Sequence, residues 1–308
     1  MKNNKLLFKY FFLFLKFLSL FLFIFLIYKA DWNSCFKELK TLNLLSVIIT
    51  IIVIYVGLIL KSIRWKNILK TYQINEKPLY LIKIFLIGGF LGIITPGKVG
   101  DFGRVYYLKR HENWKKAFSS LIIDRANDLI ILFIISFYGL VHLQNKFPND
   151  FNLTLEYKSI IVLIICLFLS LTLFIKFRDK LLAFYELIRK SSSVKNYLIQ
   201  LIITLIAIIF LYSSFIIIAH NLNINIPAID IFFIAIISGI LNLLPITILG
   251  IGVREATLVF LLGLYGVNYN TAISFSLIIF AIQIITLLPG AYFFYKSPIN
   301  LDEEKLLS

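Results

Sequence analysis

Apolar runs long enough to cross a lipid bilayer recur along the sequence. A helix needs about 20 mostly apolar residues to cross a hydrocarbon core of about 30 Å. Of the 308 residues, 60% are hydrophobic, whereas a soluble domain has about 45–50%. The runs are Leu6–Tyr28, Leu44–Leu60, Leu79–Ile94, Phe118–Leu143, Ile160–Phe177, Tyr197–Ala219, Ile229–Leu244, Ala256–Leu264 and Ala272–Tyr295. They predict an all-α polytopic membrane protein, in which residues 1–308 form a single membrane domain.

Two breaks rich in proline and glycine interrupt these runs. The first is Thr95–Arg104 and the second is Pro245–Glu255; in each, a proline near the start is followed by glycines and by an arginine four residues after a glycine. Backbone groups left unpaired in hydrocarbon cost several kcal/mol each, so such a break must line a cavity or lie at the membrane surface. Interrupted segments at corresponding places in two halves indicate a transporter binding site.

The positions of lysine and arginine predict the orientation in the membrane. With a cytoplasmic N-terminus and both broken segments folded as re-entrant hairpins, 21 of the 31 basic residues fall in cytoplasmic pieces and five in outer loops. Basic residues favour the cytoplasmic side, so both termini are expected in the cytoplasm. This distribution also explains the net charge of +15 without a nucleic-acid partner.

Under this assignment the chain divides into two halves of opposite orientation. Residues 1–143 give two spans, a hairpin entering from the cytoplasm and one span; residues 157–308 give the same order with a hairpin entering from outside. We therefore predict an inverted repeat of about six full spans plus two re-entrant hairpins, the architecture of many transporters. The alternative is eight ordinary spans with glycine-rich kinks.

Charged residues near the breaks are the candidate site. Ionisable side chains inside a membrane are costly and mark functional sites by default. Guanidinium groups could hold a lipid phosphate through charge-assisted hydrogen bonds. The candidate substrate-binding residues are Lys98, Asp101, Arg104, Asp124, Arg125, Asp128, Arg254 and Glu255.

Spacing adds an expectation about partners among these residues. Asp124 and Asp128 share a helix face and repel each other, so we expect one of them to approach Arg104 or Arg254, and both arginines to face one cavity. The alternative is that the charges are interfacial or structural ion pairs. Arg64-Trp65 is interpreted as part of a membrane-interface belt.

Several of these residues follow the pattern of a known family. Arg64-Trp65, Pro96 to Arg104, Asp124 to Asp128 and Gly250-Ile251-Gly252-Val253-Arg254-Glu255-Ala256 resemble, in order, the lysylphosphatidylglycerol synthase transmembrane-region family, also called UPF0104-type flippase-like proteins. The resemblance covers about residues 5–295. Two departures are Asp101, where the family usually has glutamate, and Ile248-Leu249-Gly250, where it usually has Pro-Gly-Gly.

The resemblance implies a lipid-translocating or lipid-binding role in the cell membrane. We expect a flippase-like transporter of an anionic or polyprenyl-type lipid headgroup, with membrane lipids as partners. The alternatives are a small-anion transporter and a non-transporting partner of a separate lipid-modifying enzyme. His111, His142 and His220 show no metal-ligand spacing, so neither a cofactor nor enzymatic activity is expected.

Overall fold

The computed structural model describes residues 21, 24–26, 28–108, 114–148, 194–242 and 252–298, and within these ranges it contains helices and no strands. The predicted all-α membrane class is therefore confirmed. The elements are α2 (Trp32–Thr41), α3 (Leu44–Thr71), α4 (Pro78–Ile94), η1 (Pro96–Leu108), α5 (Trp114–Lys146), α7 (Val194–Asn221), α8 (Ala228–Leu241), α9 (Val253–Gly263) and α10 (Tyr269–Lys296). The predicted span Ile160–Phe177, most of Leu6–Tyr28 and the tip of the second break lie outside the described residues.

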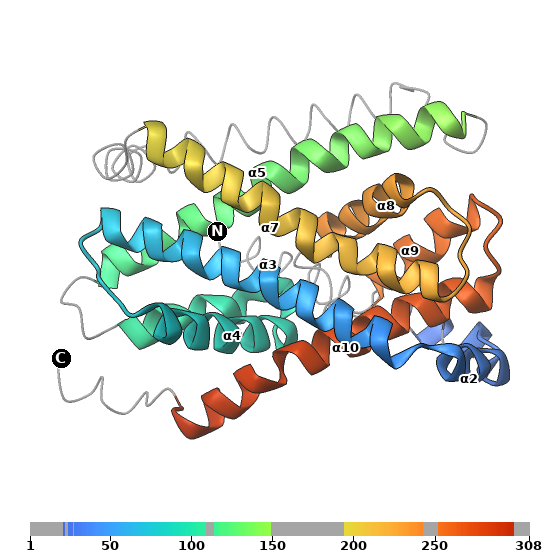
Figure 1. Cartoon of the computed structure of the whole chain (residues 1–308), viewed down its shortest axis with the longest axis horizontal. Coiled ribbons are helices and arrows are strands. Elements are labelled where there is room, and N and C mark those ends of the chain that lie inside the picture. Colours follow the sequence, from blue (N-terminus) through green and yellow to red (C-terminus); the bar gives the residue numbers. More distant parts are fainter. Residues whose placement is uncertain are drawn as a thin grey trace, which may run out of the picture.

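In the described part, four helices are long and apolar enough to cross a membrane: α3, α5, α7 and α10. They run roughly along the long axis of the molecule (Figure 1). The predicted second span, Leu44–Leu60, is too short, because α3 continues as a helix to Thr71. Its last turns therefore place Arg64 and Trp65, which we expected in a membrane-interface belt, inside the protein.

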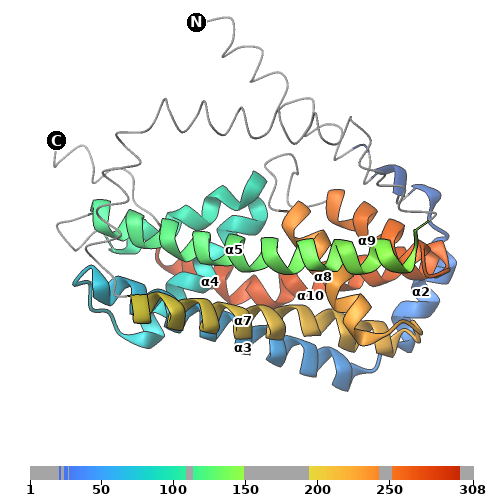
Figure 2. The same ribbon diagram turned by 90° about the horizontal axis from the view of Figure 1, so that it is seen from above.

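The two predicted breaks divide two pairs of short elements. Proline occupies the first turn of α4, where its missing N–H costs nothing. At Thr95 the backbone turns extended, and η1 follows and packs against α4. In the second half α8 packs against α9 in the same way. The two pairs lie toward opposite ends of the long axis (Figure 1 and Figure 2).

The same turn precedes both short pairs. Gln73 follows α3 and Asn223 follows α7, and each has a positive φ, of 64° and 54° respectively. In both turns the next residue, Ile74 or Ile224, donates its backbone N–H to a carbonyl five residues earlier. This is the Schellman pattern that ends many helices. The two turns lie 150 positions apart in the sequence, as do Arg104 and Arg254.

Helices α3 and α7 lie side by side and run antiparallel. The start of α3 meets the end of α7, where Asn221 hydrogen-bonds to Ser46, while Arg64 near the end of α3 bonds to Thr204 near the start of α7. Each short pair also packs on a long helix of the other half of the chain: α4 packs on α10, and α8 packs on α5. Such contacts are expected between two halves of opposite orientation. The division of the chain into repeats at residues 1–143 and 157–308 stays a prediction.

Glycines permit the close approach of these helices. A Cβ atom added at Gly290 of α10 would overlap the backbone carbonyl of Leu86 on α4. In the other half, a Cβ at Gly139 of α5 would press on the side chain of Phe233 on α8. Small residues at such crossings let membrane helices pack closely.

We expect Gly290→Ala to destabilise the protein, because the neighbouring atom is backbone and cannot rotate away. Overpacking of this kind costs about 1–3 kcal/mol, which should lower the melting temperature in detergent. The matched control is Gly263→Ala at the end of α9, where an added Cβ meets nothing within 4 Å. Equal melting temperatures for the two variants would show that α4 and α10 do not pack as described.

The orientation can be tested at the two equivalent turns. In a background with Cys35 and Cys166 replaced by serine, we expect Gln73→Cys to react with a membrane-impermeant maleimide only from the cytoplasmic side and Asn223→Cys only from outside. Both positions are exposed. Labelling of both from one side would exclude the inverted orientation.

Candidate functional site

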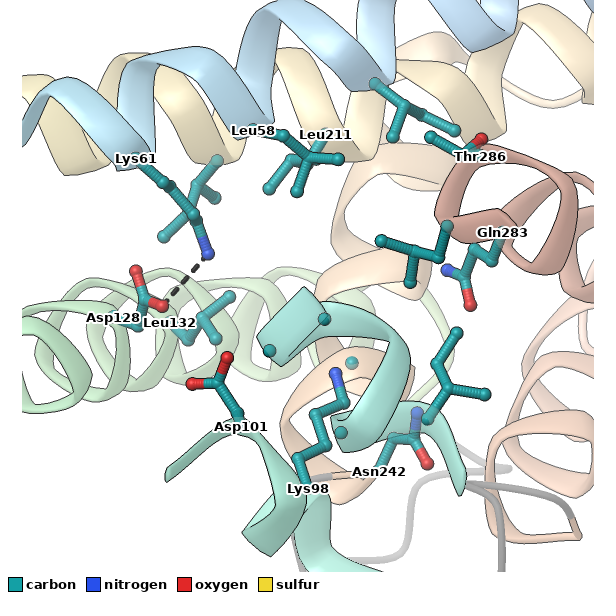
Figure 3. Close-up of a pocket in the computed structure, with 18 of the residues that line it drawn as sticks. Leu58, Lys61, Lys98, Asp101, Asp128, Leu132, Leu211, Asn242, Gln283 and Thr286 are labelled. Carbon is teal, nitrogen blue, oxygen red and sulfur yellow. Dashed lines mark hydrogen bonds and ion pairs between the residues drawn. The ribbon is translucent and has the colours of Figure 1, made fainter. Parts of the chain in front are cut away.

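A cavity of about 390 Å³ lies where the two short pairs meet the long helices. Its polar wall is drawn from both halves of the chain (Figure 3). The charged and amide residues that line it are Lys61 on α3, Lys98 and Asp101 on η1, Arg125 and Asp128 on α5, Asn242 after α8, Arg254 on α9 and Gln283 on α10. The remaining lining residues are mainly apolar side chains and glycines.

Arg64 holds the two aspartates of α5 behind this wall. Its Nε and Nη2 donate to Oδ1 of Asp124 at 2.9 and 2.6 Å, and its Nη1 donates to Oδ1 of Asp128 at 2.7 Å. Nη1 also donates to Thr204 Oγ1 at 2.7 Å. Both Arg64 and Trp65 are fully buried, so the interpretation of this pair as an interface belt is wrong: the network requires the guanidinium inside.

Arg104 is a second buried guanidinium. Its Nη2 donates to Asp101 Oδ2 at 2.8 Å and to Asp124 Oδ2 at 3.2 Å. This confirms the expectation that an aspartate of α5 approaches Arg104. Its planar head also lies 4.6 Å from the ring centre of Trp65 and 4.4 Å from that of Phe85, within the range of cation–π attraction.

The position of Arg104 corrects one expectation. It is not among the described residues that line the cavity, so it does not share an open surface with Arg254. Enclosed by two rings and two carboxylates, it positions η1 against α5.

Three other cations reach the cavity from the first half. Lys61 Nζ lies 3.0 Å from Asp128 Oδ2. Arg125 pairs through Nη2 with Asp101, and its Nε is buried without a hydrogen-bond partner among the described residues. Lys98 lines the cavity from the start of η1, where its backbone φ is 57°. It forms no ion pair with any described residue.

From the second half, Arg254 completes the wall. Its Nη1 donates to Gln283 Oε1 at 2.7 Å, and its Nε donates to Glu255 Oε1 at 3.1 Å. Glu255 also accepts from the backbone N–H of Gly252 at 2.7 Å, which caps the start of α9. Glu255 is thus a capping and pairing residue behind the wall.

The cavity therefore has an excess of positive charge. Among the described lining residues there are four cations, Lys61, Lys98, Arg125 and Arg254, and two carboxylates, Asp101 and Asp128. Both carboxylates are already paired with cations. Such a surface is complementary to an anion, because an added negative charge relieves repulsion among the cations.

Of the eight candidates, five line the cavity: Lys98, Asp101, Arg125, Asp128 and Arg254. The other three, Arg104, Asp124 and Glu255, are buried beside it and hold their neighbours in place. Sequence reasoning missed Lys61, Asn242 and Gln283. Only Lys61 carried a signal, since it lies three residues before Arg64 and shares its helix face.

The described residues contain no group of three or more His, Cys, Asp or Glu side chains that could hold a metal ion. The carboxylates near the cavity are instead bound by arginine and lysine.

Comparison with known proteins identifies similar sequences. A family model described as the lysylphosphatidylglycerol synthase TM region matches residues 12–290. UPF0104 membrane protein MJ1078 of Methanocaldococcus jannaschii is 25% identical over 236 residues, which cover 70% of this chain and 97% of that protein. UPF0104 membrane protein PH1989 of Pyrococcus horikoshii is 23% identical over 147 residues, 46% of this chain and 44% of that protein.

The ionic network should dominate stability. We expect Asp124→Asn to cost about 3–5 kcal/mol, because it leaves the buried guanidinium groups of Arg64 and Arg104 short of a counter-charge. The double variant Arg64→Met with Asp124→Leu removes one charge of each sign and should recover part of the loss. Thermal unfolding in detergent measures both. An Asp124→Asn protein that melts with the wild type would show that the charges are not buried together.

Proposed function

Because the chain belongs to the lysylphosphatidylglycerol synthase transmembrane-region family, and because its central cavity is cationic, we propose that it is a flippase-like membrane transporter that binds an anionic lipid headgroup and carries it across the bilayer. The cell membrane, with both termini in the cytoplasm, is the proposed location. The headgroup enters the cavity while the acyl chains stay in lipid.

The observation that carries this proposal is the unpaired cation Lys98. A buried or half-buried ammonium without a counter-ion is costly, and the described part of the chain supplies none for it. Arg125 Nε adds a buried donor with no described partner. A phosphate oxygen placed between Lys98 and Arg125 would satisfy both groups by charge-assisted hydrogen bonds.

The walls of the cavity suit a molecule with an apolar tail. Leu129 of α5 lines the cavity and is also 48% exposed. It continues into the exposed apolar face formed by Ile130, Phe133 and Phe137, which matches hydrocarbon in the membrane. This side of α5 is the proposed route by which acyl chains stay in lipid while the headgroup enters.

The basic residues counted for topology include some that belong to the site. Lys61, Arg64, Lys98 and Arg104 were assigned to cytoplasmic pieces, but they lie in or behind the cavity wall. Without them the count is 17 against five, which still supports cytoplasmic termini.

Arg254 offers the direct test of transport. In vesicles with a fluorescent anionic phospholipid, we expect Arg254→Ala to slow translocation by at least about tenfold, since one charge-assisted hydrogen bond is worth about 1.5–3 kcal/mol. Arg254→Lys should recover little, because an ammonium lacks the planar pair of donors that holds Gln283 and an anion together.

The matched control is Lys70→Ala, which removes one charge from an exposed position of α3 and should transport lipid at the wild-type rate. If a folded Arg254→Ala protein transports lipid at the wild-type rate, Arg254 has only a structural role at the start of α9 and does not bind the headgroup. Uptake of a small soluble anion without lipid movement would favour the alternative of an anion transporter. Lipid binding without movement would favour a partner of a separate lipid-modifying enzyme.

A further inference from the structure

We infer that helix α2 (Trp32–Thr41) anchors the protein to the membrane surface: its exposed apolar face inserts among lipids, and its lysines bind anionic headgroups. In the proposed orientation these lipids belong to the outer leaflet. The contact lies outside the central cavity, so the inference goes beyond the proposed function.

Helix α2 has three faces of different chemistry. At 3.6 residues per turn, the apolar side chains Trp32, Phe36 and Leu39 fall within an arc of about 60°, and they are 45%, 56% and 44% exposed. The exposed Lys37 and Lys40 lie beside this arc. A helix with tryptophan, phenylalanine and leucine on one face and lysines on another is typical of the membrane–water interface.

The third face holds α2 against the start of α10. The backbone N–H of Asp31, the N-cap of α2, donates to Asn270 Oδ1 at 3.1 Å, and Thr271 Oγ1 donates to Glu38 Oε1 at 2.6 Å. Asp31 and Glu38 are separated by about 10 Å along the helix, whereas Asn270 and Thr271 are adjacent. Helix α2 therefore crosses the end of α10 and does not run beside it.

This crossing places α2 along the membrane surface. Helix α10 is long and apolar enough to span a membrane, so a helix that crosses its end extends sideways near the bilayer surface. Figure 1 and Figure 2 both show α2 at the end of the long axis where α3 begins. At that depth the apolar face of α2 meets the interfacial region, and its lysines can extend to the phosphate groups.

The exposed surface of α2 is positively charged. Its one acidic residue, Glu38, is held by Thr271 on the protein side, and the carboxylate of Asp31 caps the start of the helix. Lys37 and Lys40 are exposed and form no ion pair with any described residue. Lysines near a bilayer surface attract anionic lipids, so this surface is complementary to anionic headgroups.

Exposed apolar side chains precede and follow α2 in the sequence. Phe25 and Tyr28 before it are exposed, and so are Leu44 and Leu45 at the start of the membrane-length helix α3. The apolar face of α2 lies between these two segments in the sequence. The bilayer that surrounds both segments is therefore the partner that fits this face.

Spin labels on two faces of α2 test the insertion. Phe36→Cys and Asn33→Cys are made singly in the full chain with Cys166→Ser, while the buried Cys35 stays in place, and each added cysteine receives a nitroxide. In vesicles of phosphatidylcholine with phosphatidylglycerol, collisions with oxygen are compared with collisions with a water-soluble nickel chelate.

We expect the label at position 36 to lie about 5–10 Å below the headgroup surface, with frequent oxygen collisions and few chelate collisions. The label at position 33 lies on the lysine side of the helix and is the matched control. It should show the reverse preference.

Lysine variants test the binding of anionic headgroups. In vesicles without phosphatidylglycerol, chelate collisions at position 36 should rise at least about twofold, because Lys37 and Lys40 lose their anionic partners. With Lys37→Gln and Lys40→Gln together, the collision rates should no longer depend on phosphatidylglycerol. The matched control, Lys70→Gln with Lys195→Gln, removes two exposed lysines elsewhere and should keep the dependence.

Three outcomes would overturn the inference. Frequent chelate collisions at position 36 in every vesicle would place the apolar face in water. Protection from both reagents would show that protein covers this face, and broadening by a label on another molecule would identify a second copy. Wild-type collision rates that do not depend on phosphatidylglycerol would exclude the binding of anionic headgroups. None of these measurements involves lipid transport, so the proposed function is tested separately.

Discussion

Arg64, Asp124 and Arg104 form one buried ionic network that determines how the elements around the cavity pack together. Each of these side chains is fully buried, and together they connect α3, η1 and α5. Moving isolated charges into a membrane interior is costly, so the three groups are stable there only as a set. The network fixes η1 against α5 and thereby sets the position of Lys98, Asp101 and Arg125 at the cavity.

The two halves of the chain contribute different kinds of side chain to the cavity. The first half supplies most of the charged wall, while the second supplies Arg254 together with Asn242, Gln283 and the hydroxyls of Ser238 and Thr286. These two groups of residues lie on opposite sides of the cavity (Figure 3).

The fold class and most of the charged residues that line the cavity could be predicted from sequence, because both leave strong local signals. Apolar run length indicates membrane helices, and charges within such runs stand out. We predicted Arg64 at the membrane interface, because a basic residue that follows an apolar run is typical of that position. Its burial depends on contacts with Asp124 and Asp128 of α5, which are distant in the sequence. The sequence does not single out Asn242 and Gln283, because neutral amides are common in loops and helices. Only the three-dimensional structure shows that they line the cavity.

We propose that the cavity holds the phosphate of a lipid headgroup. An experimental structure of the protein in a lipid nanodisc containing an anionic phospholipid would locate that phosphate. We expect the phosphate at hydrogen-bonding distance, about 3 Å, from Lys98 Nζ and Arg125, with the acyl chains leaving beside Leu129. A cavity filled by water or by an apolar chain, with the phosphates confined to the membrane surface, would contradict it.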